Sequence, residues 1–158
     1  MTGLAKLGQG KIGHAEIAAL IPHDGAMCLL DEVVCWDGSH ILCRSGSHRR
    51  EDHPLAREGQ LPSICGVEYA AQAMAVHGAL SGTGGTTPAG GYLASLRDVA
   101  CHVARLDRLE GDLEIEAEQL LGEAGRVIYR FAIHCDGRPV LSGRAAVVLG
   151  MPVPGVSP

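Results

Sequence analysis

The sequence predicts an α+β fold in which one long helix packs on a single antiparallel sheet. Only one segment, residues 62–80, has the pattern of a long helix, and most of the last third of the chain has strand patterns. With 158 residues, the chain has the size of one ordinary domain. Hydrophobic residues make up 46% and charged residues 20%, which supports a packed core and excludes a disordered chain.

Before the long helix, the pattern predicts a short helix, a hairpin and a loop. Pro22 ends the short helix because proline cannot continue it, and Asp37-Gly38 is a strong hairpin signal. The expected elements are a helix at 15–20, strands at 27–36 and 39–47, and an irregular charged loop at 48–58.

The long helix at 62–80 carries apolar residues at three- and four-residue steps. These residues form a stripe, and alanines fill much of the remaining surface, so we expect a helix that is buried nearly all round. The residues of the stripe are Ile64, Val67, Ala71, Met74 and Gly78.

The last third predicts four strands, and residues 113–118 alternate cleanly between apolar and acidic side chains. The strands are expected at 92–103, 113–121, 126–135 and 139–149, with turns at 122–125 and 136–137. The glycine-rich segment 81–91 is interpreted as a connector, because it follows a helix and lacks the lysine of a phosphate-binding loop. The expected organisation is a flexible leader at 1–13, one domain at 14–150 and a disordered tail at 151–158.

The composition argues against several classes of protein. A net charge of -5 and 3% aromatic residues disfavour a nucleic-acid-binding protein. The six cysteines form no CxxC pair and no zinc-finger spacing, so we expect no metal site and reduced thiols in a cytoplasmic protein. The first residues contain no long apolar region, so we expect no secretory signal, and no apolar stretch is long enough to cross a bilayer.

The stretch from 53 to 72 is the strongest functional signal. Glu68 is a single carboxylate near the start of an apolar helix, and His53 precedes that helix in a loop. Because burying an unpaired charge is costly, Glu68 is solvated, caps the helix or takes part in chemistry. His53 is either a loop histidine in solvent or the partner of Glu68 in a cleft. Cys65 is a small packed residue or a nucleophile, and the absence of an evident base beside it favours packing.

Several motifs, taken in order, resemble the hotdog-fold 3-hydroxyacyl-[acyl-carrier-protein] dehydratase family. The match covers residues 17–149 and is closest to the dehydratase-like proteins of aryl-polyene-type biosynthetic clusters. Two positions depart from the family pattern: Ser63 replaces a glycine, and His53 lies one residue further from Glu68. The motifs are Ile21-Pro22-His23, Leu29-Leu30-Asp31-Glu32-Val33, Glu68-Tyr69-Ala70-Ala71-Gln72, Gly111-Asp112-Leu113 and Asp136-Gly137.

The resemblance implies a hotdog fold that dimerises, as a homodimer or with a homologous dehydratase. It implies dehydration of a 3-hydroxyacyl thioester to the trans-2-enoyl thioester, with His53 as base and Glu68 as acid from opposite subunits. Gln72, one turn beyond, would orient Glu68. Backbone N–H groups at the start of the helix would bind the thioester oxygen, and the residues concerned are Ser63, Ile64, Cys65 and Gly66. No cofactor is implied, because the substrate arrives on the phosphopantetheine of acyl carrier protein.

Two other functions remain open on the same fold: an acyl thioesterase, and a non-catalytic subunit that pairs with an active homologue. The basic residues Arg49, Arg50 and Arg57 flank the expected mouth of the site. They are either a contact surface for an acidic carrier protein or an ordinary solvated loop.

Overall fold

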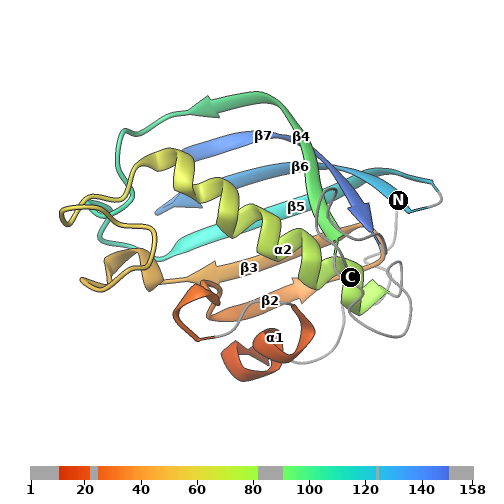
Figure 1. Cartoon of the computed structure of the whole chain (residues 1–158), viewed down its shortest axis with the longest axis horizontal. Coiled ribbons are helices and arrows are strands. Elements are labelled where there is room, and N and C mark those ends of the chain that lie inside the picture. The colour runs from red at the N-terminus through yellow and green to blue at the C-terminus, as the bar shows by residue number, and fades with distance from the viewer. Residues whose placement is uncertain (1–10, 22–24, 82–90, 124, 150–158) are drawn as a thin grey trace, which may run out of the picture.

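The computed structural model describes residues 11–21, 25–81, 91–123 and 125–149. It confirms the α+β prediction: one long helix, α2, lies across one face of a single antiparallel sheet (Figure 1). The sheet has seven strands in the order β1-β2-β3-β5-β6-β7-β4. The strands are β1 (Ile12–Gly13), β2 (Glu32–Trp36), β3 (His40–Ser45), β4 (Gly91–Cys101), β5 (Leu113–Glu123), β6 (Arg126–Cys135) and β7 (Arg138–Leu149).

The alternation predicted for 113–118 places one face of β5 in the core. Leu113, Ile115 and Ala117 are fully buried, whereas the glutamates between them point outward. Strand β6 continues the pattern with Phe131 and Ile133, which pair in register with β5. The inward side chains of both strands therefore form the floor on which α2 rests.

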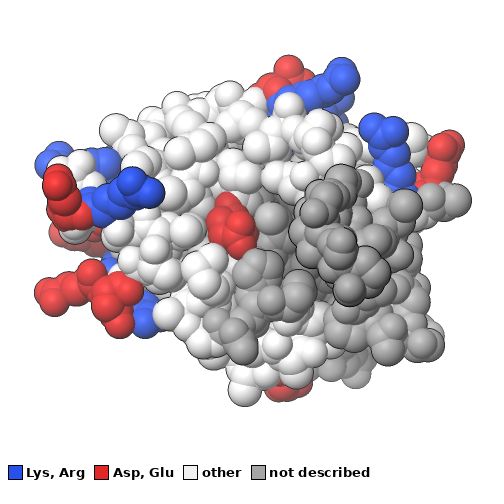
Figure 2. All heavy atoms as spheres, in the orientation of Figure 1, with Lys and Arg blue, Asp and Glu red and all other residues white. Residues whose placement is uncertain are grey.

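Helix α2 (Gly66–Ser81) is largely buried, but only part of the predicted stripe is. Tyr69, Ala73 and Val76 are fully buried against the sheet. By contrast, Val67 and Ala71 of the predicted stripe are only half-buried, and Ile64 is 52% exposed. Met74 and Gly78 of the stripe are buried, however, and every residue of α2 is either buried or half-buried, so the helix has no fully exposed side. Figure 2 shows that the molecular face carrying α2 has one acidic side chain near its centre, surrounded by uncharged residues, while most other charged side chains lie near its margins.

The long helix starts later than predicted. Residues 63–65 form a separate 3₁₀ turn (Ser63–Cys65), and α2 begins at Gly66. The N–H of Ser63 donates to the carbonyl of Ala104 instead of entering a helix, which fixes the turn to the segment after β4. Gly66 packs closely on the sheet, since an added Cβ would lie 2.8 Å from Leu141 Cδ2 and 3.0 Å from Ile133 Cδ1.

The strand predicted at 27–36 was wrong in its first half. Residues Gly25–Met27 form a 3₁₀ turn, and β2 begins only at Glu32. The segment between them belongs to no strand or helix, and the peptide of Leu29 bonds to side chains from β3, the following turn and α2. Tertiary contacts therefore replace strand pairing here.

Other predictions have mixed outcomes. The short helix is confirmed as α1 (His14–Leu20). Ile12 and Gly13, expected within the leader, pair with Val33 and Glu32 of β2. The loop expected at 48–58 begins with a 3₁₀ turn, Ser47–Arg49. The first ten residues, the proline-rich tail and most of the glycine-rich connector lie outside the described residues, as do Pro22 and His23.

No helix in the described ranges is long and apolar enough to cross a membrane.

Candidate functional site

Glu68 lies in the first turn of α2, where an acid complements the helix dipole, and it is half-buried. Gln72 is one turn further along and is 1% exposed. Its Nε2 donates to Glu68 Oε1 over 3.1 Å and to the carbonyl oxygen of Met27 over 2.7 Å. Gln72 therefore contacts the predicted acid directly and is itself held by the segment before β2.

His53 is buried, with 4% of its surface exposed. Its Nδ1 accepts a hydrogen bond from the N–H of Leu55 at 3.1 Å, and its Nε2 lies 3.0 Å from Tyr69 Oη. A backbone N–H can only donate, so Nδ1 carries no proton and the neutral ring carries its proton on Nε2. The ring is therefore fixed as one tautomer.

The environment of His53 favours its neutral form. Burial is the main cause that lowers its pKa, and the charges of Arg50 and His48 lower it further. Protonation would also turn Nδ1 into a donor facing the Leu55 N–H. Tyr69, which receives the Nε2 proton, is fully buried, and burial raises its pKa to about 12. Both groups stay uncharged near neutral pH.

The hydrogen bonds of His53 do not include Glu68. Both ring nitrogens of His53 are bonded elsewhere, to Leu55 and to Tyr69. Tyr69 follows Glu68 in α2 but turns inward to the sheet, whereas Glu68 remains half-exposed.

The entrance to α2 has fewer available amides than the sequence suggested. The N–H of Ser63 donates to Ala104 O, that of Cys65 to Pro62 O, and that of Gly66 to Ile64 O and Ser63 O. Of the four residues predicted to bind the thioester oxygen, 63–66, Ile64 is the one whose N–H has no acceptor in the part of the chain that the structure describes. The hydroxyl of Ser63 is buried and also lacks a partner among the described residues. These two groups are the candidate hydrogen-bond donors at the helix start.

Cys65 fits the packed alternative. Burial raises the pKa of its thiol, which disfavours the thiolate needed for attack. All six cysteines are free thiols, in agreement with the absence of a disulfide framework.

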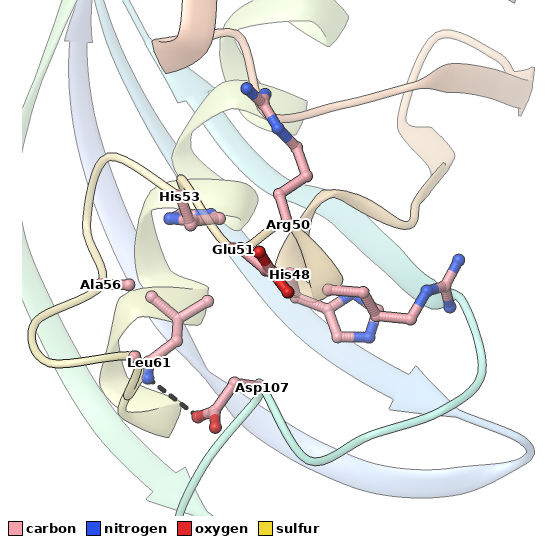
Figure 3. Close-up of a pocket in the computed structure, with 9 residues that line it drawn as sticks. His48, Arg50, Glu51, His53, Ala56, Leu61 and Asp107 are labelled. Atoms are coloured by element: carbon pink, nitrogen blue, oxygen red, sulfur yellow. Dashed lines mark hydrogen bonds between the residues drawn. The ribbon is translucent and has the colours of Figure 1, made fainter.

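A cavity of about 410 Å³ lies beside His53. Figure 3 shows this cavity between the loop that carries His53 and the loop that carries Asp107. A hydrogen bond from Leu61 N to Asp107 Oδ1 connects the two loops. His48, 1% exposed, also lines it and donates from Nε2 to Leu109 O. The remaining residues of the lining are Arg49, Arg50, Glu51, Ala56 and Gly59.

Two of the three predicted basic residues are already paired. Arg49 bonds to Asp112 over 2.7 Å, and Arg50 to Asp52 over 3.2 Å. Arg57 is exposed and has no ion pair within the described ranges. The mouth therefore carries less free positive charge than the sequence alone suggested.

Sequence reasoning missed the buried hydroxyls that surround the two predicted residues. Tyr69, Ser45 and Ser47 are almost completely buried and hydrogen-bonded to one another or to the Leu29 carbonyl. A usable signal existed for Tyr69, since a tyrosine in an alanine-rich buried helix must find a partner for its hydroxyl. Nothing in the sequence marked the two serines.

Solved structures with this architecture define the fold as a hotdog. The dehydratase heterocomplex ApeI:P from Xenorhabdus doucetiae matches with a TM-score of 0.73 and 24% identity, over 87% of this chain and 91% of that chain. An HP0420 homologue from Helicobacter felis matches with a TM-score of 0.63 and 8% identity, over 89% and 91%. A hypothetical thioesterase from Streptococcus pneumoniae, in a Thr68Ala mutant, matches with a TM-score of 0.55 and 13% identity, over 73% and 86%. At these identities the likeness concerns the fold alone.

The sequence then specifies the family within that fold. Residues 15–151 match the ApeP-like family, described as ApeP dehydratase, and the chain belongs to it. No curated protein matches the chain.

Proposed function

We propose that this protein takes part in dehydrating a 3-hydroxyacyl thioester, carried on acyl carrier protein, to the trans-2-enoyl thioester. Its membership of a dehydratase family supports this reaction class. The observation on which the proposal depends most is Glu68, a half-buried carboxylate in the first turn of α2 that Gln72 holds by a hydrogen bond.

In the proposed reaction, His53 removes a proton from the carbon next to the thioester carbonyl. The carbon–oxygen bond at C3 breaks, and Glu68 donates a proton to the departing hydroxyl, which leaves as water. Ile64 N–H would bind the carbonyl oxygen while negative charge develops on it. The reaction itself needs no cofactor beyond the phosphopantetheine that carries the acyl group.

The proposed active unit is a dimer, with a second copy or with a homologous dehydratase. Strand β4 ends the sheet, so its outer edge has no strand partner among the described residues. Leu93 and Leu96 on this strand are 37% and 38% exposed. Pairing through this edge would extend the sheet and bring a second subunit toward the face seen in Figure 2, where one acidic side chain is surrounded by uncharged residues.

A second candidate function is a subunit that supports an active homologue without doing the chemistry. One observation favours it: both ring nitrogens of His53 are bonded inside the chain, and the ring is 4% exposed. To act as base, His53 would have to release the Leu55 N–H before it took a proton on Nδ1.

The test is to incubate the protein with 3-hydroxyacyl carrier protein, alone and with a homologous dehydratase, and to measure enoyl product and free thiol separately. Glu68→Gln should lower enoyl formation by about 10²–10⁴-fold. The matched control is Glu114→Gln, which removes a carboxylate from the outward face of β5. Thiol release without enoyl product would identify a thioesterase. Activity that appears only with the homologue and persists in Glu68→Gln would identify a supporting subunit.

A further inference from the structure

The peptide group of Leu29 is held from both sides by buried side chains. Leu29 is fully buried, and its N–H donates to Gln72 Oε1 over 2.9 Å. Its carbonyl oxygen accepts hydrogen bonds from Ser45 Oγ and from Ser47 Oγ, the latter over 2.9 Å. A short segment between a turn and a strand is thus held by three side chains that are at most 6% exposed.

From the carbonyl side, a continuous chain of hydrogen bonds leads to His53. Ser47 Oγ lies 2.6 Å from Tyr69 Oη, which lies 3.0 Å from His53 Nε2. Because His53 must donate from Nε2, Tyr69 accepts that bond and donates its own proton to Ser47. Ser47 in turn donates to Leu29 O. Every donor along the chain points the same way, from the histidine to the peptide.

From the N–H side, a second chain leads to Glu68. Gln72 accepts from Leu29 N through Oε1, and its Nε2 donates to Glu68 Oε1 and to Met27 O. The amide orientation follows from these contacts, because a backbone N–H requires the oxygen and a backbone carbonyl requires the nitrogen. The two chains meet at one residue, Leu29.

We propose that Tyr69 and Gln72 are positioning residues that join His53 and Glu68, through the Leu29 peptide, into one cooperative hydrogen-bonded unit. The hydrogen bonds themselves do not depend on the proposed function; only the effect of the network on catalysis rests on it. Since the groups that link His53 to Glu68 are buried, namely Ser47, Tyr69, Gln72 and the Leu29 peptide, a shift of one leaves another without a partner, which is costly in a protein interior. A substitution that alters the bonding of Glu68 therefore changes the environment of His53, and the reverse, although the two residues share no hydrogen bond.

The energetic test is a double-mutant cycle on unfolding by urea, with Tyr69→Phe and Gln72→Met. Coupled residues should give a combined effect that departs by about threefold or more from the product of the single effects on the unfolding constant. The control cycle replaces Tyr69→Phe with Tyr129→Phe. Tyr129 is also buried and bonded to a histidine, His77, but shares no partner with Gln72. That cycle should be multiplicative within about twofold.

The spectroscopic test follows the histidine rings by nitrogen NMR. Gln72→Met should shift the ring signals of His53 and leave those of His77 unchanged, whereas Tyr129→Phe should do the reverse. If Gln72→Met does not fold, the reciprocal measurement decides: Tyr69→Phe should shift the carboxyl carbon signal of Glu68. The proposal would be overturned if the effects of Tyr69→Phe and Gln72→Met on the unfolding constant simply multiply. It would also be overturned if the ring signals of His53 and the carboxyl signal of Glu68 do not shift on the distant substitution. No readout uses enoyl formation, so the result stands apart from that of the activity assay.

Discussion

Helix α2 has a buried histidine–tyrosine pair near each end, and the two pairs donate in opposite directions. At the N-terminal end, the Tyr69 hydroxyl accepts a hydrogen bond from His53 and donates one to Ser47. At the C-terminal end, His77 of the helix donates from Nε2 to Asp37 O over 2.9 Å and accepts from Tyr129 through Nδ1 over 2.7 Å. The bonds of the His53–Tyr69 pair continue through Ser47 to Leu29, whereas those of the His77–Tyr129 pair end at the carbonyl of Asp37.

The geometry of the pairs differs accordingly. The rings of His53 and Tyr69 lie nearly parallel at 27°, whereas His77 and Tyr129 meet edge-on at 90°. His53 lines a cavity, whereas the His77 pair joins α2 to β6 and to the turn between β2 and β3. The same two residue types therefore serve a candidate site at one end and a purely structural cross-link at the other. The contrast shows that burial and hydrogen bonding of a histidine do not by themselves identify a functional one.

The largest expected difference between the two ends is in activity. In the proposed dehydratase, His53→Gln should lower enoyl formation by about 10²–10⁴-fold, because the ring would be the base. His77→Gln should change the rate of the folded protein by less than about tenfold, since His77 contacts no site residue. Steady-state assays at equal concentrations of folded protein measure both. Equal losses in the two variants would remove the distinction between the ends, and an unchanged rate in His53→Gln would favour the supporting subunit.

Removing either tyrosine hydroxyl should destabilise the fold. Tyr69→Phe leaves the Nε2 proton of His53 without an acceptor, and Tyr129→Phe leaves Nδ1 of His77 without a donor. Each should lower the free energy of unfolding by about 1–3 kcal/mol, and Tyr69→Phe by more, because Ser47 also loses its donor. Urea unfolding measures the two values. The comparison fails if Tyr129→Phe is the more costly change.

Acidification should weaken both ends. Burial is the largest cause that lowers the pKa of His48, His53 and His77 below the ordinary value of ~6.5. The unfolded chain then binds more protons, so their stabilising contribution is complete above pH ~6.5 and is lost as the pH falls toward the folded pKa values.

The variant His77→Gln should reduce this pH dependence by up to one proton, or about 1.4 kcal/mol per pH unit at most. The measurement is urea unfolding between pH 5 and 8. His134→Gln, on the outward face of β6, is the control for loss of a histidine. A His77→Gln curve parallel to that of the unchanged protein would mean that His77 does not titrate differently on folding.

The smallest expected effect distinguishes the two glycines of α2. An added Cβ at Gly78 meets no described atom within 4 Å, whereas at Gly66 it would press on Leu141 and Ile133. Gly78→Ala should therefore raise the free energy of unfolding by about 0.5–1 kcal/mol through helix propensity. Gly66→Ala should lower it, because the sheet approaches that end of the helix too closely. Thermal or urea unfolding checks the two signs, and the same sign for both would contradict the packing.

The sequence by itself determined the architecture and one half of the candidate site. Period-two alternation at 113–118 and the single long helical pattern specify a one-helix antiparallel fold, because these periods decide which side chains share a face. The four-residue spacing of Glu68 and Gln72 likewise determined that they meet on α2, since residues one turn apart are neighbours on a helix.

Only the tertiary structure decided which side of α2 faces the core and what His53 does. Alanines on most sides of the helix made its faces nearly equivalent by hydrophobicity, so packing of Tyr69, Ala73 and Val76 on the sheet made the choice. The bond between His53 and Tyr69 and those of the Leu29 peptide join residues that lie 16 to 43 positions apart in the chain. Such contacts depend on the three-dimensional approach of loops, turns and helix, and no local pattern encodes them.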